Sequence, residues 1–334
     1  MLKTILALGT TALISAITLS GGAIAQQTPD FGCAPEPASA EVRYESKFVE
    51  VLGANMHYYE AGPSDRPVVL LLHGLPVSAY FWRNVMPHLE SNSRVIALDH
   101  IGFGKSDRPA GFDYSLQDHI DHIGGFVDAL GLEDIVVVGQ DLGSMSGMIW
   151  AQQNAEKIRA VAFVEGLIPP LLPVRAETTP EQLLGIWQAT RNPPMAQQMF
   201  VDGNFFIDQA LPSLTACPMA DEVMATYAAS WSDPDDRPIL FATPAELPID
   251  GQPPKYEPTI AAYVEWLTTA TTPKLLVQAT PGVLMPEALV KQAAQMMPNS
   301  AVAEIGGGLH FLAESKPDAL GEALNNWINE LPSN

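Results

Sequence analysis

Basic residues are scarce in this sequence of 334 residues, which contains 17 lysines and arginines against 38 aspartates and glutamates. The resulting net charge of −21 argues against nucleic acid as a partner, because binding to phosphates depends on lysine and arginine. Such acidity favours solubility and carries no information about the fold.

Cysteine is also rare, with only Cys33 and Cys217 present. No spacing typical of a metal site occurs, and no glycine loop has the form that binds phosphates, so we expect neither a metal nor an organic cofactor. In an oxidising compartment the two thiols could form one disulfide between the N-terminal region and the middle of the chain. Two separate buried thiols agree equally well with the sequence.

Long apolar runs are absent except at the N-terminus. Lys3 precedes an apolar segment from Ile5 to Leu19, and Ala23-Ile24-Ala25 forms a small-x-small cleavage signal before Gln26. The segment is short and is interrupted by threonine and serine, which disfavours a membrane anchor. We therefore predict a signal peptide over residues 1–25, no membrane association after cleavage, and a periplasmic or secreted mature protein.

The mature chain is predicted to hold one α/β core interrupted by an insertion. Residues 26–42, rich in proline, alanine and glutamine, are expected to form a mobile arm. Two segments, 43–168 and 254–334, alternate apolar strands with helical patterns, which indicates a mostly parallel sheet flanked by helices. Between them, residues 169–253 lose this alternation and are predicted to form a helical lid. The expected parallel strands are Val68 to Leu72, Arg94 to Leu98, Ile135 to Val138, Val161 to Val164, Lys274 to Gln278 and Val302 to Ile305.

The central strand ends in the pentapeptide Gly139-Gln140-Asp141-Leu142-Gly143, followed by a helix-like segment. Small residues around a reactive side chain, on a sharp turn between strand and helix, are typical of a nucleophile elbow. Here the nucleophile would be the carboxylate of Asp141, which forms an ester with its substrate. The alternative is an ordinary helix N-cap, a role that aspartate also fills.

Two further segments complete the predicted site. His73-Gly74-Leu75-Pro76 follows the first parallel strand, where it is either an ordinary turn or one wall of an oxyanion hole. In the second interpretation, the backbone N–H groups of Leu75 and Leu142 are the two donors. The run from Gly306 to Gly308 precedes His310, which is placed near the C-terminus as a catalytic base would be in this fold.

The acid that orients His310 could follow either of two strands. The strand after the predicted lid has no acid until Glu287, whereas the strand from Val161 to Val164 leads directly into Glu165. Glu165 is therefore the preferred candidate.

These motifs make the chain resemble the haloalkane dehalogenases of the α/β-hydrolase fold, from about Phe48 to Leu331. The resemblance is closest to the branch whose catalytic acid follows the sixth strand, and it implies that Asp141, Glu165 and His310 are nucleophile, acid and base. It also implies a substrate pocket lined by Trp187, Phe206 and Leu284. The segments that carry it are His73 to His88, Asp99 to Asp107, Asn204 to Pro212, Glu246 to Ile249 and Thr280 to Leu284.

Two positions depart from the family pattern. Family members usually place asparagine in the turn after the first parallel strand and tryptophan directly after the nucleophile, and both side chains hold the departing halide. Here these positions are Leu75 and Leu142, whose side chains donate no hydrogen bond. Trp187 is either a replacement donor, as a lid tryptophan is in another branch, or a packed aromatic residue.

Three functions remain open at this point. The preferred one is a dehalogenase-like hydrolase that acts on small apolar substrates with water, through an aspartyl ester and with an atypical halide site. The second is an epoxide hydrolase, in which lid tyrosines chosen from Tyr227, Tyr256 and Tyr263 would protonate the ring oxygen. The third is a binding protein that has lost its chemistry. The oligomeric state is left open.

Overall fold

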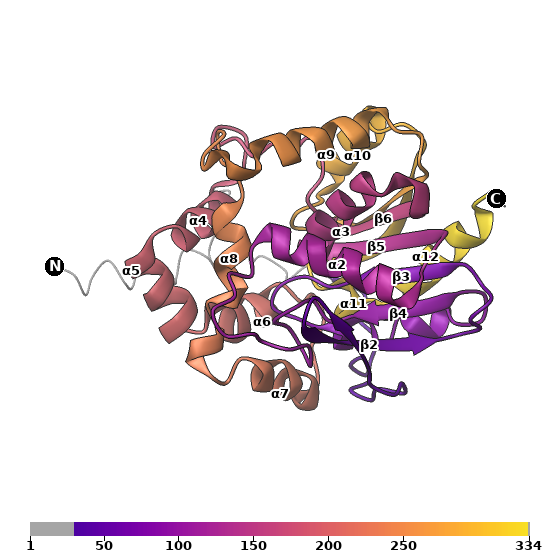
Figure 1. The fold of residues 1–334 in the computed structure, drawn as a ribbon, viewed down its shortest axis with the longest axis horizontal. Helices are drawn as coiled ribbons and strands as arrows, with labels where there is room; N and C mark the ends of the chain where they lie inside the picture. Colours follow the sequence, from indigo (N-terminus) through magenta and orange to yellow (C-terminus); the bar gives the residue numbers. More distant parts are fainter. Residues whose placement is uncertain (1–29, 333–334) are drawn as a thin grey trace.

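The computed structural model describes residues 30–332, so the predicted signal peptide lies outside the described part of the chain. Its centre is an eight-stranded sheet with the order β1-β2-β4-β3-β5-β6-β7-β8 (Figure 1). β1 (Lys47–Val51), β2 (Ala54–Ala61) and β4 (Arg94–Leu98) pair antiparallel, and every other neighbouring pair is parallel. The remaining strands are β3 (Val68–Leu72), β5 (Ile135–Asp141), β6 (Ile158–Gly166), β7 (Lys274–Pro281) and β8 (Ser300–Gly308).

The central strands are apolar because helices cover both faces of a mostly parallel sheet. Every residue of β3 is buried, as is every residue of β5 before Asp141. One of the flanking helices is delimited by its own sequence, since Ser115 and Asp118 form a capping box at its start and Gly131 ends it with φ +59°. The helices outside the predicted lid are α2 (Leu116–Leu130), α3 (Leu142–Gln153), α9 (Glu257–Thr269), α10 (Glu287–Met296), α11 (Leu312–Ser315) and α12 (Pro317–Glu330).

The last strand extends further than the sequence predicts. Gly306 to Gly308, which lie beyond the predicted strand, continue β8, and Gly307 and Gly308 pair with Thr280 and Pro281 of β7. A Cβ atom at residue 307 would lie 2.8 Å from the backbone of Phe31, so glycine there makes room for the N-terminal segment. As a consequence His310 lies directly beyond the carboxyl end of β8.

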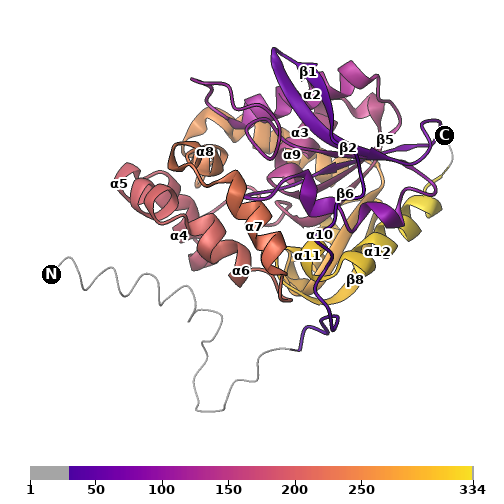
Figure 2. The same ribbon diagram turned by 90° about the horizontal axis from the view of Figure 1, so that it is seen from below.

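Residues of the predicted lid gather at one side of the sheet, in both views of the fold (Figures 1 and 2). They form α4 (Glu181–Thr190), α5 (Pro193–Ala196), α6 (Leu211–Ser213), α7 (Asp221–Ser230) and α8 (Ile239–Glu246). Two short π-helical segments, Gln197–Asp202 and Phe206–Ala210, connect α5 to α6. Within residues 30–332, no helix is both long enough and apolar enough to cross a membrane.

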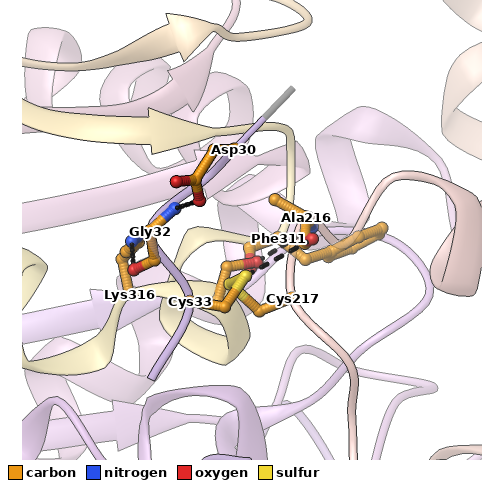
Figure 3. Close-up of a disulfide and its surroundings, with 8 residues drawn as sticks. Asp30, Gly32, Cys33, Ala216, Cys217, Phe311 and Lys316 are labelled. Atoms are coloured by element: carbon orange, nitrogen blue, oxygen red, sulfur yellow. Dashed lines mark hydrogen bonds between the residues drawn. A yellow bond between two sulfur atoms is a disulfide. The ribbon is translucent and has the colours of Figure 1, made fainter. Parts of the chain in front are cut away.

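The N-terminal segment from residue 30 to residue 42 has no regular secondary structure and lies against the rest of the molecule. A disulfide joins Cys33 to Cys217, with their Cα atoms 5.5 Å apart, so the two cysteines pair (Figure 3). The Tyr80 hydroxyl donates to the carbonyl of Ala40 at 2.8 Å, and Arg83 Nε donates to the carbonyl of Ser39 at 2.7 Å.

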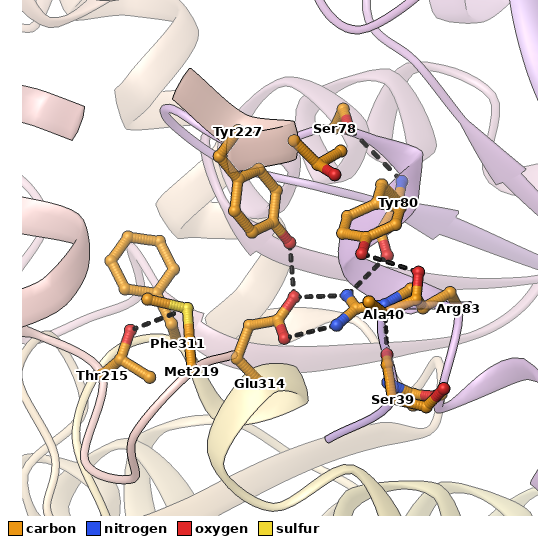
Figure 4. Close-up of polar contacts among 12 residues, drawn as sticks. Ser39, Ala40, Ser78, Tyr80, Arg83, Thr215, Met219, Tyr227, Phe311 and Glu314 are labelled. Atoms are coloured by element: carbon orange, nitrogen blue, oxygen red, sulfur yellow. Dashed lines mark hydrogen bonds and ion pairs between the residues drawn. The ribbon is translucent and has the colours of Figure 1, made fainter. Parts of the chain in front are cut away.

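A buried ion pair lies next to this segment. Arg83 donates to both carboxylate oxygens of Glu314, which belongs to α11, at 2.5 and 2.9 Å (Figure 4). The hydroxyl of Tyr227, from α7, donates to the same carboxylate. Both charged side chains are fully buried, where an ion pair is tolerated only if its hydrogen bonds are satisfied. The cluster therefore connects the N-terminal segment, the predicted lid and the core.

Candidate active site

Asp141 lies on a sharp turn between β5 and α3. Its φ of +49° with ψ of −117° is a strained combination for an L-residue, of the kind that clusters at functional sites. The turn also brings α3 close to the sheet, since a Cβ atom at Gly139 would lie 2.6 Å from Gly143 O, and one at Gly143 would lie 2.4 Å from Leu72 O. The two glycines around Asp141 are therefore required by the geometry of the elbow.

The carboxylate of Asp141 faces the turn after β3 on one side and His310 on the other. The backbone N–H of Leu75 donates to Asp141 Oδ1 at 3.0 Å, and His310 Nε2 lies 3.6 Å from Oδ2. Leu142 is the first residue of α3, so its N–H group has no acceptor within the helix. Both N–H groups predicted for the oxyanion hole thus lie near the carboxylate of Asp141. That of Leu75 is hydrogen-bonded to it, and that of Leu142 belongs to the next residue in the sequence.

Glu165 lies at the end of β6, beside the nucleophile strand, and its side chain is fully buried. Its Oε2 accepts hydrogen bonds from the backbone N–H groups of Val283 and Leu284 at 2.9 and 2.7 Å. The same oxygen lies 3.3 Å from His310 Nδ1. The carboxylate is therefore held in position by backbone donors and contacts the imidazole from the side opposite Asp141.

His310 follows β8, and its backbone is attached to the predicted lid because its N–H donates to the carbonyl of Leu214 at 3.0 Å. Burial lowers the pKa of His310. The Glu165 carboxylate at Nδ1 and the charge of Asp141 outweigh that effect, so the pKa is raised above its ordinary value. An imidazole placed between two carboxylates can accept a proton from water and return it later.

A small apolar cavity of about 110 Å³ lies above Asp141. Leu75 and Leu142 contribute to its wall, so the two positions at which the resemblance implies halide donors present apolar side chains here. Trp187, Phe206 and Leu284 also line it. The other lining residues are Pro76, Asp141, Met145, Leu167, Leu183, Ile186, Phe205, Ala210, Leu214, Thr243, Pro244, Leu247, Val283, His310 and Phe311.

Trp187, from α4, is 9% exposed, and its indole N–H has no hydrogen-bond partner among residues 30–332. The hydroxyl of Thr243, another polar group of the wall, donates to the carbonyl of Tyr114. The indole N–H is therefore the side-chain donor of the lid wall that remains free to bind a ligand.

The tyrosines considered for epoxide opening lie elsewhere. Tyr227 donates to Glu314, Tyr263 donates to the carbonyl of Leu167, and Tyr256 accepts from the backbone of Gln117. None of the three lines the cavity above Asp141. The structure thus provides no lid tyrosine where an epoxide oxygen would need a proton.

Several contacts of the site were not predicted from the sequence. The side chain of Gln140, next to the nucleophile, reaches His310, with 2.9 Å between the two Nε2 atoms. The hydroxyl of Ser144 donates to the carbonyl of Asp141 at 2.6 Å and accepts from the N–H of Leu167 at 3.0 Å, which joins the elbow to the end of β6. One signal was available for Gln140, a polar residue within an otherwise apolar strand. The backbone N–H groups that donate to Glu165 could not be predicted from the amino-acid sequence.

Across the described residues, no group of three or more histidine, cysteine, aspartate or glutamate side chains is arranged to hold a metal ion.

Comparison with known proteins gives a consistent result. Residues 67–317 match the family described as alpha/beta hydrolase fold. The chain is 32% identical to a haloalkane dehalogenase from Mesorhizobium japonicum, over 89% of this chain and 94% of that protein. Among solved structures, the ancestral haloalkane dehalogenase AncHLD2 matches with a TM-score of 0.80 and 36% identity, over 85% of this chain and 99% of that one. Haloalkane dehalogenase DbeA from Bradyrhizobium elkani matches with a TM-score of 0.81 and 32% identity, over 86% and 98%.

Proposed function

Because the chain belongs to the haloalkane dehalogenase family of the α/β-hydrolase fold and is a hydrolase, we propose that it cleaves carbon–halogen bonds of small apolar alkyl substrates through an ester on Asp141. One observation supports this most strongly. A carboxylate on a positive-φ elbow opens into an apolar cavity, with His310 and Glu165 aligned behind it.

The reaction has two steps. In the first, a carboxylate oxygen of Asp141 attacks the saturated carbon and the halide leaves with the bonding electron pair, which gives an alkyl ester. In the second, His310 Nε2 accepts a proton from water and the hydroxide attacks Cγ of the ester. The N–H groups of Leu75 and Leu142 hold the oxyanion. The intermediate then releases the alkoxide, which receives the proton from His310. The carboxylic acid left on Asp141 loses its proton to water by way of His310, which regenerates the carboxylate.

Trp187 is proposed as the donor for the departing halide. It is an unpartnered N–H group in the wall of the cavity, whereas Leu75 and Leu142 present methyl groups to the same space. One preorganised donor that stabilises developing negative charge increases the rate by a factor of about 10²–10³. An enzyme with the indole of Trp187 as its single donor should therefore be slower than one with two donors.

The function is tested by incubating the purified protein with bromoalkanes and with styrene oxide while halide and diol are measured. We expect halide and no diol. The His310→Ala variant should accumulate a covalent adduct on Asp141, detected by mass spectrometry of peptides, because the ester can form but cannot be hydrolysed. Diol without halide would indicate an epoxide hydrolase instead. The absence of both products and of any adduct would indicate a binding protein.

The leaving-group site is tested by three variants. Trp187→Phe keeps the aromatic ring and removes the N–H donor, so we expect kcat/KM for bromoalkanes to fall by about 10²-fold. Leu75→Asn adds a side-chain donor of similar size and should raise it, whereas Leu75→Met should leave it unchanged. Equal activity of Trp187→Phe and the wild type would show that the indole N–H does not bind the halide.

We also propose export to the periplasm or the medium. The N-terminal signal of the sequence and the Cys33–Cys217 disulfide both support an oxidising destination. N-terminal sequencing of the exported protein should begin at Gln26. Retention of Lys3 and the apolar segment in the mature protein would contradict this proposal.

A further inference from the structure

Gln140 is the closest polar neighbour of the catalytic nitrogen of His310. Its side chain is fully buried in β5, and its Nε2 lies 2.9 Å from His310 Nε2, whereas Asp141 Oδ2 lies 3.6 Å away. The amide oxygen of Gln140 has no hydrogen-bond partner among the described residues. It lies against the turn after β3, since a Cβ atom at Gly74 would be 2.4 Å from that oxygen.

This arrangement determines which proton His310 carries. Glu165 Oε2 can only accept, so the imidazole directs Nδ1–H toward it, which leaves Nε2 with a lone pair. An amide N–H of Gln140 donates to that lone pair. The contact favours the neutral imidazole, because in the protonated form two donors would face each other.

The protonation state of His310 depends on the charged groups that surround its imidazole. Among the described residues, the titratable groups that act on it are Asp141, at the end of β5, and Glu165, at the end of β6. The predicted lid contributes the carbonyl of Leu214, and the ring of Phe311 packs edge-on against the imidazole. Both carboxylates favour protonation. A protonated His310 would pair with Asp141, which would weaken the nucleophile before the first step and remove the base needed for the second.

We propose that Gln140 is a positioning residue that donates a hydrogen bond to Nε2 of His310, which limits protonation of the base and keeps it separate from Asp141 until the ester has formed. This inference rests on the proposed function. Formation of the ester removes the charge of Asp141. A water molecule bound to the ester then takes the place of the amide N–H at Nε2, transfers its proton there and attacks Cγ, and the proton later leaves with the alkoxide.

The protonation state is tested directly by NMR of protein labelled with ¹⁵N in its histidines, with His310→Gln used to assign the signal. In the wild type we expect the imidazole, once neutral at a pH above its raised pKa, to carry its proton on Nδ1 and to leave Nε2 free. Gln140→Met keeps the side-chain length and removes the donor, so the pKa of His310 should rise by about one pH unit, the effect of one hydrogen bond. Gln140→Glu replaces the donor with a charge and should raise the pKa further.

A neutral imidazole that carries its proton on Nε2 in the wild type would overturn the proposal, and this measurement requires no variant to fold. An unchanged pKa in Gln140→Met would also overturn it, as would a lower pKa, which would mean that the amide oxygen accepts from Nε2–H. A residue with a purely structural role would not produce the ordered rise from glutamine through methionine to glutamate.

Kinetics of the two steps provide the second measurement. In rapid-mixing experiments with a bromoalkane, the pH midpoint of ester hydrolysis should shift upward in Gln140→Met, and its rate at neutral pH should fall about tenfold, as expected for one lost hydrogen bond. Wild-type protein that forms no ester with any bromoalkane would contradict the proposed function, while the NMR titration would still decide the role of Gln140.

Discussion

At the scale of single residues, Glu165 is held by its surroundings before it contacts His310. Backbone donors at Val283 and Leu284 bind its Oε2, and the same oxygen lies 3.3 Å from His310 Nδ1. A carboxylate that is already bound in this way loses little side-chain entropy when it orients the imidazole. Its charge also favours the imidazolium that forms during hydrolysis of the ester.

We therefore expect Glu165→Gln to slow the second step and spare the first. The amide keeps the shape of the side chain, but it carries no charge and places N–H groups among backbone donors. Hydrolysis of the ester should slow by about 10²–10⁴-fold, while halide release in the first turnover continues. Rapid-quench mass spectrometry would show the ester accumulating.

The control is Glu287→Gln, which alters the other acid considered from the sequence. Glu287 is exposed on α10 and paired with Lys291. Equal behaviour of the two variants would contradict the role of Glu165.

A second residue, His119 of α2, makes stability dependent on pH. It is buried, and neither ring nitrogen has a hydrogen-bond partner within residues 30–332. Desolvation, with a smaller effect of His73, lowers its pKa to about 3. In the unfolded chain the same group takes up a proton near pH 6.5. As the pH falls from about 6.5 toward 3, the unfolded state therefore binds a proton that the folded state does not, and the free energy of unfolding decreases.

In the His119→Leu variant, the unfolded state should bind one proton fewer as the pH falls. Between pH 6 and pH 4 the free energy of unfolding of the variant should decrease less steeply, by about 1.4 kcal/mol per pH unit. Burial lowers the pKa of His73 and His100 as well, so some acid sensitivity should remain. Urea unfolding at a series of pH values measures both slopes. Parallel slopes would show that His119 is not neutral in the folded protein.

The sequence was sufficient to predict where the candidate triad residues lie, for a physical reason. Asp141, Glu165 and His310 each follow a parallel strand, and the carboxyl ends of such strands meet at one edge of the sheet. The contact between Gln140 and His310 was not predicted, because it depends on where the residues after β8 lie relative to β5. The donors at Val283 and Leu284 belong to the backbone, whose hydrogen bonds do not depend on which side chains are present.

At the scale of elements, strands and helices with a clear apolar pattern agree with the sequence, and segments formed by tertiary contacts do not. α2 begins and ends where its own sequence caps it, at Ser115 and at Gly131. β8 is longer than predicted because both of its ends pair with β7, Ser300 with Lys274 and Gly308 with Pro281. The two π-helical segments of the predicted lid were not predicted either, and they carry Phe200 and Phe206, whose rings stack on each other.

The packing of α3 on the sheet predicts opposite effects for the same substitution in two helices. Gly143→Ala places a Cβ atom 2.4 Å from the backbone of Leu72, so α3 must move away from β3 and the elbow must shift. We expect a loss of about 1–3 kcal/mol in stability and reduced activity. Gly185→Ala, in α4, meets no atom within 4 Å and should raise stability by about 0.5–1 kcal/mol. Thermal unfolding distinguishes them, and destabilisation by both variants would contradict the open surroundings of Gly185.

At the scale of the whole molecule, the N-terminal segment joins two parts of the chain that the sequence predicts as separate units. The disulfide attaches it to Cys217 within the predicted lid, and the carbonyls of Ser39 and Ala40 attach it to Arg83 and Tyr80 of the core (Figures 3 and 4). The segment that carries Cys217 also reaches the base, because the carbonyl of Leu214 accepts from His310 N at 3.0 Å. The segment from Leu214 to Cys217 thus contacts both the disulfide and the catalytic base.

These two roles separate in a variant without the disulfide. The bond links residues 184 positions apart, so its removal enlarges the unfolded ensemble, and Cys33→Ser/Cys217→Ser should lose about 2–4 kcal/mol of unfolding free energy. The hydrogen bonds from His310 N to Leu214 O and from Ala216 N to Ser315 Oγ do not involve the sulfur atoms. The base should therefore stay in place, with kcat and KM unchanged at 25 °C. Urea unfolding and steady-state kinetics of the double variant, with reduced wild-type protein as control, test both parts. A large fall in kcat without loss of stability would show that the disulfide positions the base directly.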